Sequence, residues 1–176
     1  MKLWDSLLGF MTKKDEPLHV GEVMHLWKIL ASLEEGRSIL QGMLNHTPDP
    51  ELKRYLESFL TDYVGPWVDR LKHFMQDHGI PLPLATTEKP KANEADIPPG
   101  AKFSDEEIAG LIAAKLVAGT GFVQQGLLEC LNYELATMLL ELEVSHYRQA
   151  FVLRETMERR GWLKRPPEWH ASKASE

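Results

Sequence analysis

Cysteine is almost missing from this 176-residue sequence, which contains only Cys130. A disulfide within the chain and a cysteine-based zinc site are therefore excluded, and we expect a reducing, cytoplasmic environment. Cys130 lies among leucines, where a buried thiol is more common than a reactive one. We therefore expect Cys130 to be inert.

Positive charge is also scarce, with 20 Lys and Arg against 26 Asp and Glu and a net charge of −6. Because phosphate contacts need a basic surface, we expect no nucleic-acid partner. No apolar run approaches the roughly 20 residues of a membrane span, and no phosphate-binding glycine loop or nucleophile elbow occurs. With 43% hydrophobic residues, the expectation is a soluble chain with one core.

What the sequence does contain is helical spacing of apolar residues. This spacing predicts four long helices, at about residues 19–45, 50–78, 105–131 and 133–160. Five prolines fall within 79–104, which we expect to be an extended crossover. The predicted bundle covers residues 19–162 and is followed by a C-terminal tail, 163–176.

Capping signals support these boundaries. Asp49 followed by Pro50 is typical of a helix start, and Ser104 with Glu107 forms a capping box. Asn132 is a plausible cap for the last helix. The second helix contains Pro66, which should kink it because proline cannot donate to the carbonyl four residues earlier.

The lengths of the connections predict the topology. Short joints within each pair of helices predict two antiparallel hairpins. A helix of about 27 residues spans about 40 Å, and the crossover can run that whole length. The predicted fold is all-α, a ferritin-like four-helix bundle of two antiparallel hairpins joined by a long proline-rich crossover. A faint internal repeat, in which 41–52 resembles 125–135, fits this arrangement.

An amphipathic N-terminal segment, residues 1–18, precedes the bundle. Within residues 1–14 one helical face carries apolar side chains, and lysines lie at both ends; the apolar residues are Trp4, Leu7, Leu8 and Met11. Asp5 and the short length argue against a secretory signal. Two interpretations remain: a flap packed on the bundle, which is the commoner case, and a peripheral contact of residues 1–14 with a membrane surface or a partner.

A Glu-x-x-His pair at Glu143 and His146 raises the possibility of a metal site. Di-iron helical bundles use this pair twice, together with a Glu from each of two further helices. A second pair, Glu22 and His25, is expected about 10 Å away in height, level with residue 136. The full set of weak candidates for metal ligands is Glu143, His146, Asp62, Glu34 or its neighbour Glu35, Glu22 and His25.

The third helix argues against two metal ions. No Asp or Glu occurs between Glu107 and Glu129, although that helix should supply a ligand near residue 121. We therefore predict no metal and no cofactor, with a single iron or manganese ion as the alternative. A lone solvated Glu143 and a core His146 are the commoner interpretation.

Two glycines stand at this height instead. Gly119 and Gly121 indicate close helix packing, which is the commoner reason, or room for a ligand. The second interpretation predicts a pocket in the bundle core bordered by Gly119, Gly121, His146 and Gln149.

Four stretches together resemble a known family: 15-DEPLHVGEV-23, 44-LNHTPDPELKRYLE-57, 97-IPPGAKFSDEEIA-109 and 161-GWLKRPP-167. They are similar to the domain of unknown function 3231 family of spore-forming bacteria. The second half, with His146 ahead of Gly161-Trp162, is also similar to the spore coat protein F domain. The resemblance implies a ferritin-like bundle, often internally duplicated, with no established reaction.

These observations favour a non-enzymatic bundle that acts through its surface. We expect it to self-associate, for example as a homodimer, or to bind a protein partner, in a sporulation or stress context and with association with the spore as a second location. The alternatives are a ferritin-like metal-binding protein and a small-molecule binder that uses a cavity in the core.

Overall fold

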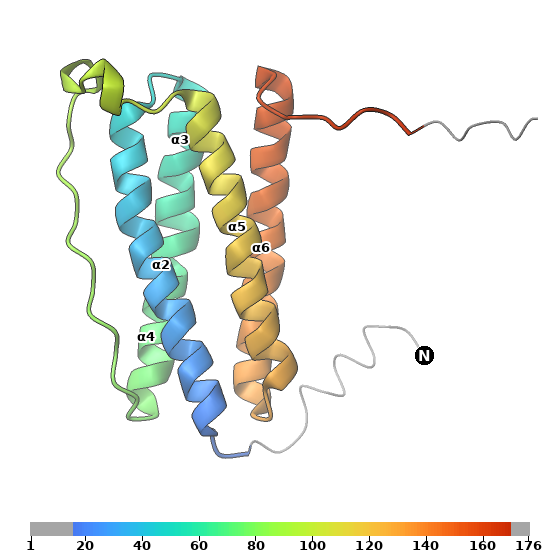
Figure 1. Cartoon of the computed structure of the whole chain (residues 1–176). Coiled ribbons are helices and arrows are strands. Elements are labelled where there is room, and N and C mark those ends of the chain that lie inside the picture. The colour runs from blue at the N-terminus through green and yellow to red at the C-terminus, as the bar shows by residue number, and fades with distance from the viewer. Residues whose placement is uncertain (1–15, 170–176) are drawn as a thin grey trace, which may run out of the picture.

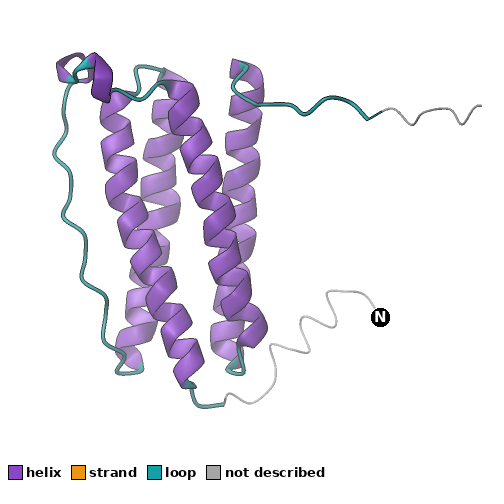
Figure 2. Ribbon diagram, viewed as in Figure 1, coloured by secondary structure: helices purple, strands orange, loops and turns teal. Residues whose placement is uncertain are grey.

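The computed structural model describes residues 16–169 and contains four helical rods packed side by side (Figure 1, Figure 2). The first rod is α2 (Val20–His46). The second is continuous through α3 (Pro50–Ser58), a π-helical turn η1 (Phe59–Val64) and α4 (Gly65–Asp77). The third and fourth are α5 (Asp105–Glu129) and α6 (Tyr133–Arg160). No strand occurs among the described residues, which confirms the prediction of an all-α four-helix bundle.

The helix starts follow the capping signals in the sequence. Asp49 accepts hydrogen bonds from the backbone of Glu51 and Leu52 at the start of α3. Ser104 and Glu107 form the predicted capping box of α5, and the Asn132 side chain caps α6. Because polar side chains satisfy these free N–H groups, the turns fall close to where the sequence indicates them.

The two hairpins are joined by a long connection that runs outside α2 (Figure 1). Two short 3-10 turns, η2 (Glu94–Asp96) and η3 (Pro99–Ala101), precede α5. Hydrogen bonds fix this crossover to α2: Thr86 donates to the carbonyl of Glu34, and the backbone of Lys89 donates to the side chain of Gln41. The return path makes the second and third rods parallel, as predicted.

Leucines dominate the core, and residues of all four rods contribute to it. Leu26, Leu56, Leu71, Ile108 and Leu139 are completely shielded from solvent. By length and composition alone, Pro99–Glu129 could also cross a membrane, a test that core helices of soluble proteins pass as well. Residues 1–15 and 170–176 lie outside the described part of the chain, as does most of the predicted N-terminal segment.

Candidate functional site

The middle of the second rod departs from regular α-helix. Phe59–Val64 form a π-helical turn, in which the backbone N–H of Gly65 donates to the carbonyl of Leu60. Pro66 follows at once, and a regular helix would press its ring against the carbonyl of Asp62. The sequence predicted a kink here; the structure has one widened turn within a continuous rod. Because π-helical turns are frequent at functional sites, the side chains around this turn are candidates for a functional site.

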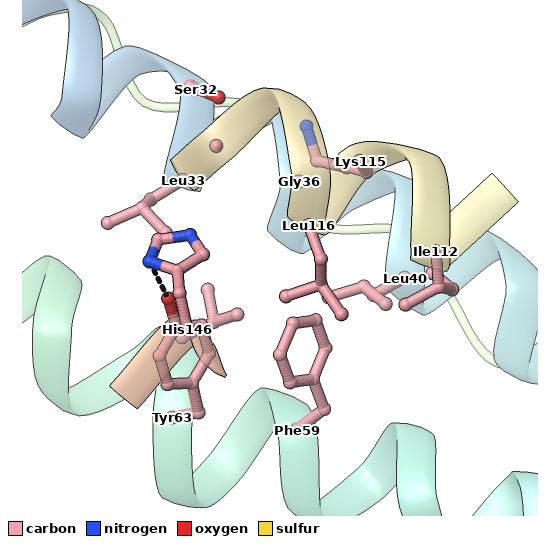
Figure 3. Close-up of a pocket in the computed structure, with 12 residues that line it drawn as sticks. Ser32, Leu33, Gly36, Leu40, Phe59, Tyr63, Ile112, Lys115, Leu116 and His146 are labelled. Atoms are coloured by element: carbon pink, nitrogen blue, oxygen red, sulfur yellow. Dashed lines mark hydrogen bonds between the residues drawn. The ribbon is translucent and has the colours of Figure 1, made fainter. Parts of the chain in front are cut away.

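Tyr63 projects from this π turn onto the only buried histidine of α6 (Figure 3). The Tyr63 hydroxyl lies 2.9 Å from Nδ1 of His146, and the two rings meet edge to face. Nδ1 also lies 3.2 Å from the carbonyl of Leu142. Burial lowers the pKa of His146 and raises the pKa of Tyr63, which favours the neutral form of both side chains at pH 7.

Gly119 of α5 provides the space for this histidine. A Cβ atom at Gly119 would lie only 2.7 Å from Nε2 of His146, so any larger residue would displace the imidazole. Gly121, by contrast, is exposed and faces open space. Of the two glycines predicted to border a pocket, only Gly119 does so.

A cavity of about 40 Å³ lies beside His146. Residues of all four rods line it, including Phe59 and Tyr63 of the π turn, Gly119, and Lys115 (Figure 3). Gln149, which was predicted to border the pocket, does not line it; its backbone carbonyl accepts from Tyr55. The volume suits a few water molecules and is far below the roughly 300 Å³ of a typical small-molecule site.

Glu143 lies one turn before His146 and is almost completely buried, with 5% of its surface exposed. Neither carboxylate oxygen has a well-aligned hydrogen-bond partner among the described residues. The hydroxyl of Tyr147 is the nearest donor: its hydrogen bond to the Glu143 carboxylate is the main reason why the pKa of this tyrosine is raised, although the bond is poorly aligned. A buried carboxyl with so little hydrogen bonding is costly, so Glu143 lowers the stability of the core.

The other candidate metal ligands are engaged elsewhere. Glu22 accepts hydrogen bonds of 2.8 Å from the backbone of both Leu131 and Asn132, so its carboxylate is held at the α5–α6 turn, away from Glu143. His25 bonds Glu129, which lies at the end of α5.

Glu34 and Asp62 are also separate from Glu143. Glu34 pairs with Lys72 of α4, and Asp62 is exposed and accepts from Ser58 and Thr61. Within residues 16–169, no group of three His, Cys, Asp or Glu side chains could hold a metal ion. A metal at Glu143 and His146 therefore stays a hypothesis that rests on two ligands from one helix.

The sequence did not indicate the role of Tyr63 or Lys115. The signal for Tyr63 was the Gly65-Pro66 pair, which marks a local change in helix geometry without specifying its kind. The signal for Lys115 was Gly36, which leaves room for the lysine chain: a Cβ there would lie 2.7 Å from Cε of Lys115.

The sequence matches a known family over almost its whole length. A family described as "Protein of unknown function (DUF3231)" matches residues 8–174. The chain belongs to this family. An uncharacterized protein of Bacillus subtilis (strain 168), YvdQ, is 29% identical over 154 residues, which cover 88% of this chain and 90% of that protein.

A crystal structure of another Bacillus protein has a similar fold. It is that of a "putative spore coat protein" from Bacillus halodurans C-125, which is 27% identical and superposes with a TM-score of 0.84. The match covers 89% of this chain and 98% of the other. This DUF3231 protein therefore has a known fold in a family without a described reaction.

Proposed function

We propose that this DUF3231 protein is a non-enzymatic structural protein of sporulation that acts by associating with a second copy of itself. Membership of the family supports an unknown, sporulation-related role, because the similar crystal structure carries a spore coat description. The observation that carries the association is an exposed apolar surface on the second hairpin.

This surface, the outer α5–α6 face, consists of two rows of residues. On α5 the row contains Gly110, Ala114, Val117, Gly121 and Leu128, and on α6 it contains Val144, Tyr147 and Phe151. Spacings of three, four and seven residues place each row on one side of its helix, and the exposed Gln124 stands between Gly121 and Leu128. Val117 is 75% exposed and Phe151 is 61% exposed, and it is the grouping of such side chains into one patch, rather than the exposure of any one of them, that marks an interaction surface.

Contacts elsewhere place the two rows next to each other. Gly110 lines a groove together with Met157 of α6, so the row on α5 lies on the side of α6. On α6, Glu141 reaches Arg70 of α4, and the row runs from Val144, which is next to Glu141, round the helix to Tyr147 on the side of α5. Gly119 and His146 are level, so Val117 and Gly121 stand at the height of Val144 and Tyr147.

Charge makes this face the part of the surface where a second copy can approach. Each chain carries a net charge of −6, so two copies repel each other over most of their surface. The outer α5–α6 face has no acidic residue on α5 between Glu107 and Glu129, and the one lysine there, Lys115, points to α2. Only 22% of the most apolar window of this helix is buried within the chain. A two-fold axis across this face would lay the α6 row of each copy on the α5 row of the other.

The small residues of the face favour close approach. Gly110, Ala114 and Gly121 leave little side chain above the backbone of α5. The larger Val144, Tyr147 and Phe151 of a second copy could pack into that shallow strip, as ridges pack into grooves between helices. This complementarity within one surface is what a symmetric contact requires.

Sedimentation velocity of the full chain tests the association. We expect the wild type to sediment as a dimer or larger, and Val117→Glu to shift it to monomer, because each interface would then bury two unpaired charges. Leu84→Glu is the matched control, since Leu84 is 95% exposed on the crossover, remote from the face. A monomeric wild type, or equal effects of the two variants, would remove this proposal.

The sporulation role has its own test. Immunoblots of growing cells, sporulating cells and purified spores of the source bacterium should show the protein appearing during sporulation and remaining with spores. Equal amounts in growing cells, with none in spores, would contradict the role and leave the association to be judged separately.

A further inference from the structure

A groove separates α2 from α5 in the lower half of the bundle, on the side of α5 away from the outer α5–α6 face. Its volume is about 380 Å³. Trp27 of α2 and Phe122 of α5 line it, and they are 43% and 45% exposed. The charged residues Lys28 and Glu35 lie along the same groove. An aromatic groove with charges along it is suited to an amphipathic helix.

The chain preceding the described residues leaves the bundle at the lower end of this groove. The side chain of Asn132 donates a hydrogen bond of 2.6 Å to the backbone carbonyl of Glu16. Asn132 lies at the α5–α6 turn, and the nearby bond between His25 and Glu129 joins α2 to the end of α5. His25 also lines the groove, so residue 15 emerges within reach of its lower end.

We infer that residues 1–15 of this same chain occupy the α2–α5 groove as an amphipathic helix. Fifteen helical residues extend about 22 Å, and the groove follows α2 from His25 to Glu35, about 15 Å. The segment is thus long enough to fill the groove and short enough to remain beside it. It is also amphipathic, with Trp4, Leu7, Leu8 and Met11 on one face.

The position of Glu16 determines which residues of segment 1–15 would face which residues of the groove, and apolar side chains face each other in this alignment. A segment that descends beside α2 and turns back at residues 16–19 places Leu8 at the height of Trp27 and Trp4 at the height of Ala31. Phe122 stands about one turn above Gly126, which packs on His25, so Phe122 also faces Leu7 and Leu8. The apolar face of the segment therefore meets the aromatic part of the groove.

Charges agree with the same register. Asp5 comes to the height of the groove between Lys28 and Ser32, on the flank of the apolar face, where it can approach the Lys28 ammonium. Lys2 comes to the level of Glu35, near the upper end. The groove thus offers a side chain of opposite sign to each of the two charges of the segment.

Disulfide trapping in the full chain tests the docking. In a Cys130→Ser background, Leu8→Cys is combined with Phe122→Cys, and Met11→Cys with Gln125→Cys as a second pair. We expect both pairs to form a disulfide within one chain under mild oxidation, because docking brings the Cα atoms within the roughly 7 Å that a disulfide requires. The bond is read as a shift of the monomer band without reductant, and as a tryptic cross-link by mass spectrometry.

Leu8→Cys with Val144→Cys is the matched control, since Val144 is 52% exposed on the outer α5–α6 face. This pair should not form. A bond to Val144, bonds only between chains, or no bond in either groove pair would each overturn the inference. Circular dichroism verifies the fold of every variant. Because the groove and the outer face are separate, the result is independent of whether two copies associate.

Discussion

Replacing Glu143 by Met should stabilise the protein. The carboxyl is 5% exposed, and neither oxygen has an aligned partner among the described residues. A buried polar group without a hydrogen bond costs about 1–3 kcal/mol, and an ionised one costs more. Met has a similar length and helix propensity and no polar atom, so the substitution removes this cost without leaving a cavity.

The expected gain is therefore about 1–3 kcal/mol in the free energy of unfolding. For a chain of this size, each kcal/mol raises the midpoint of thermal unfolding by about 2–4 °C. Urea unfolding followed by circular dichroism gives the free energy directly, and the wild type and the variant should have equal slopes against urea concentration. Glu141→Met is the control: Glu141 is half exposed and pairs with Arg70 at the surface, so its loss should cost at most about 1 kcal/mol.

A Glu143→Met protein that is less stable than the wild type would refute this reasoning. It would mean that the carboxylate has a partner that compensates its burial, and the two candidates are the Tyr147 hydroxyl and a bound cation. Elemental analysis of wild-type protein purified without chelator decides that point. Stoichiometric iron or manganese that disappears in Glu143→Met would establish the metal-binding alternative.

Three further predictions concern local contacts. Gly119→Ala should lower the free energy of unfolding, measured with urea, by about 0–2 kcal/mol, because the clash with His146 outweighs the gain in helix propensity. In a His146→Ala background the same change should be stabilising by up to about 1 kcal/mol. Destabilisation in both backgrounds would contradict the contact between Gly119 and His146. Burial and the neighbouring Glu22 raise the pKa of Cys130 to about 12, so iodoacetamide at pH 8 should alkylate the folded protein about 100-fold more slowly than the unfolded one, as measured by mass spectrometry; equal rates would contradict the burial. Burial would raise the pKa of Glu22, but hydrogen bonds from the backbone of Asn132 and its neighbours lower the pKa from 4.5 to about 2. Stability that is present above pH 4.5 should therefore be lost as the pH falls towards 2, by on the order of 3 kcal/mol, and Glu22→Gln should show a smaller loss in acid titration.

The arrangement of the rods was predictable because its signals are local. Asp49, Ser104 and Asn132 each cap a helix with their own side chain, so three residues mark the starts of three rods. The length of the connection then decides which rods are parallel. Antiparallel register from the α5–α6 turn placed residue 121 level with Glu143, and the contact between Gly119 and His146 agrees with this.

The site was less predictable because it depends on contacts between distant rods. Nothing near Tyr63 in the sequence indicates that its hydroxyl meets His146, since the π turn that directs it is a response to Pro66. The spacing of Glu22 and His25 matches a metal-binding motif and therefore indicated a possible metal ligand. In the structure the Glu22 carboxylate satisfies the backbone of the α5–α6 turn, a role that has no spacing signature.

The outer α5–α6 face shows the opposite case. Its signal is the lack of Asp and Glu between Glu107 and Glu129, which by itself argues against a metal site and does not specify a surface. Which side of α5 faces outwards depends on how α2 and α6 pack around it, and that is a tertiary property. The exposure of Val117 and Phe151 in the structure is what shows that this uncharged side of α5 and α6 is an apolar surface.

Sedimentation equilibrium of the wild-type chain from micromolar to several hundred micromolar concentration tests the central claim most directly. Association through the outer α5–α6 face predicts that the mass rises from the 20.1 kDa of one chain towards that of a dimer or beyond, and that Val117→Glu stays at the mass of one chain. A wild-type mass of 20.1 kDa at every concentration would contradict the account.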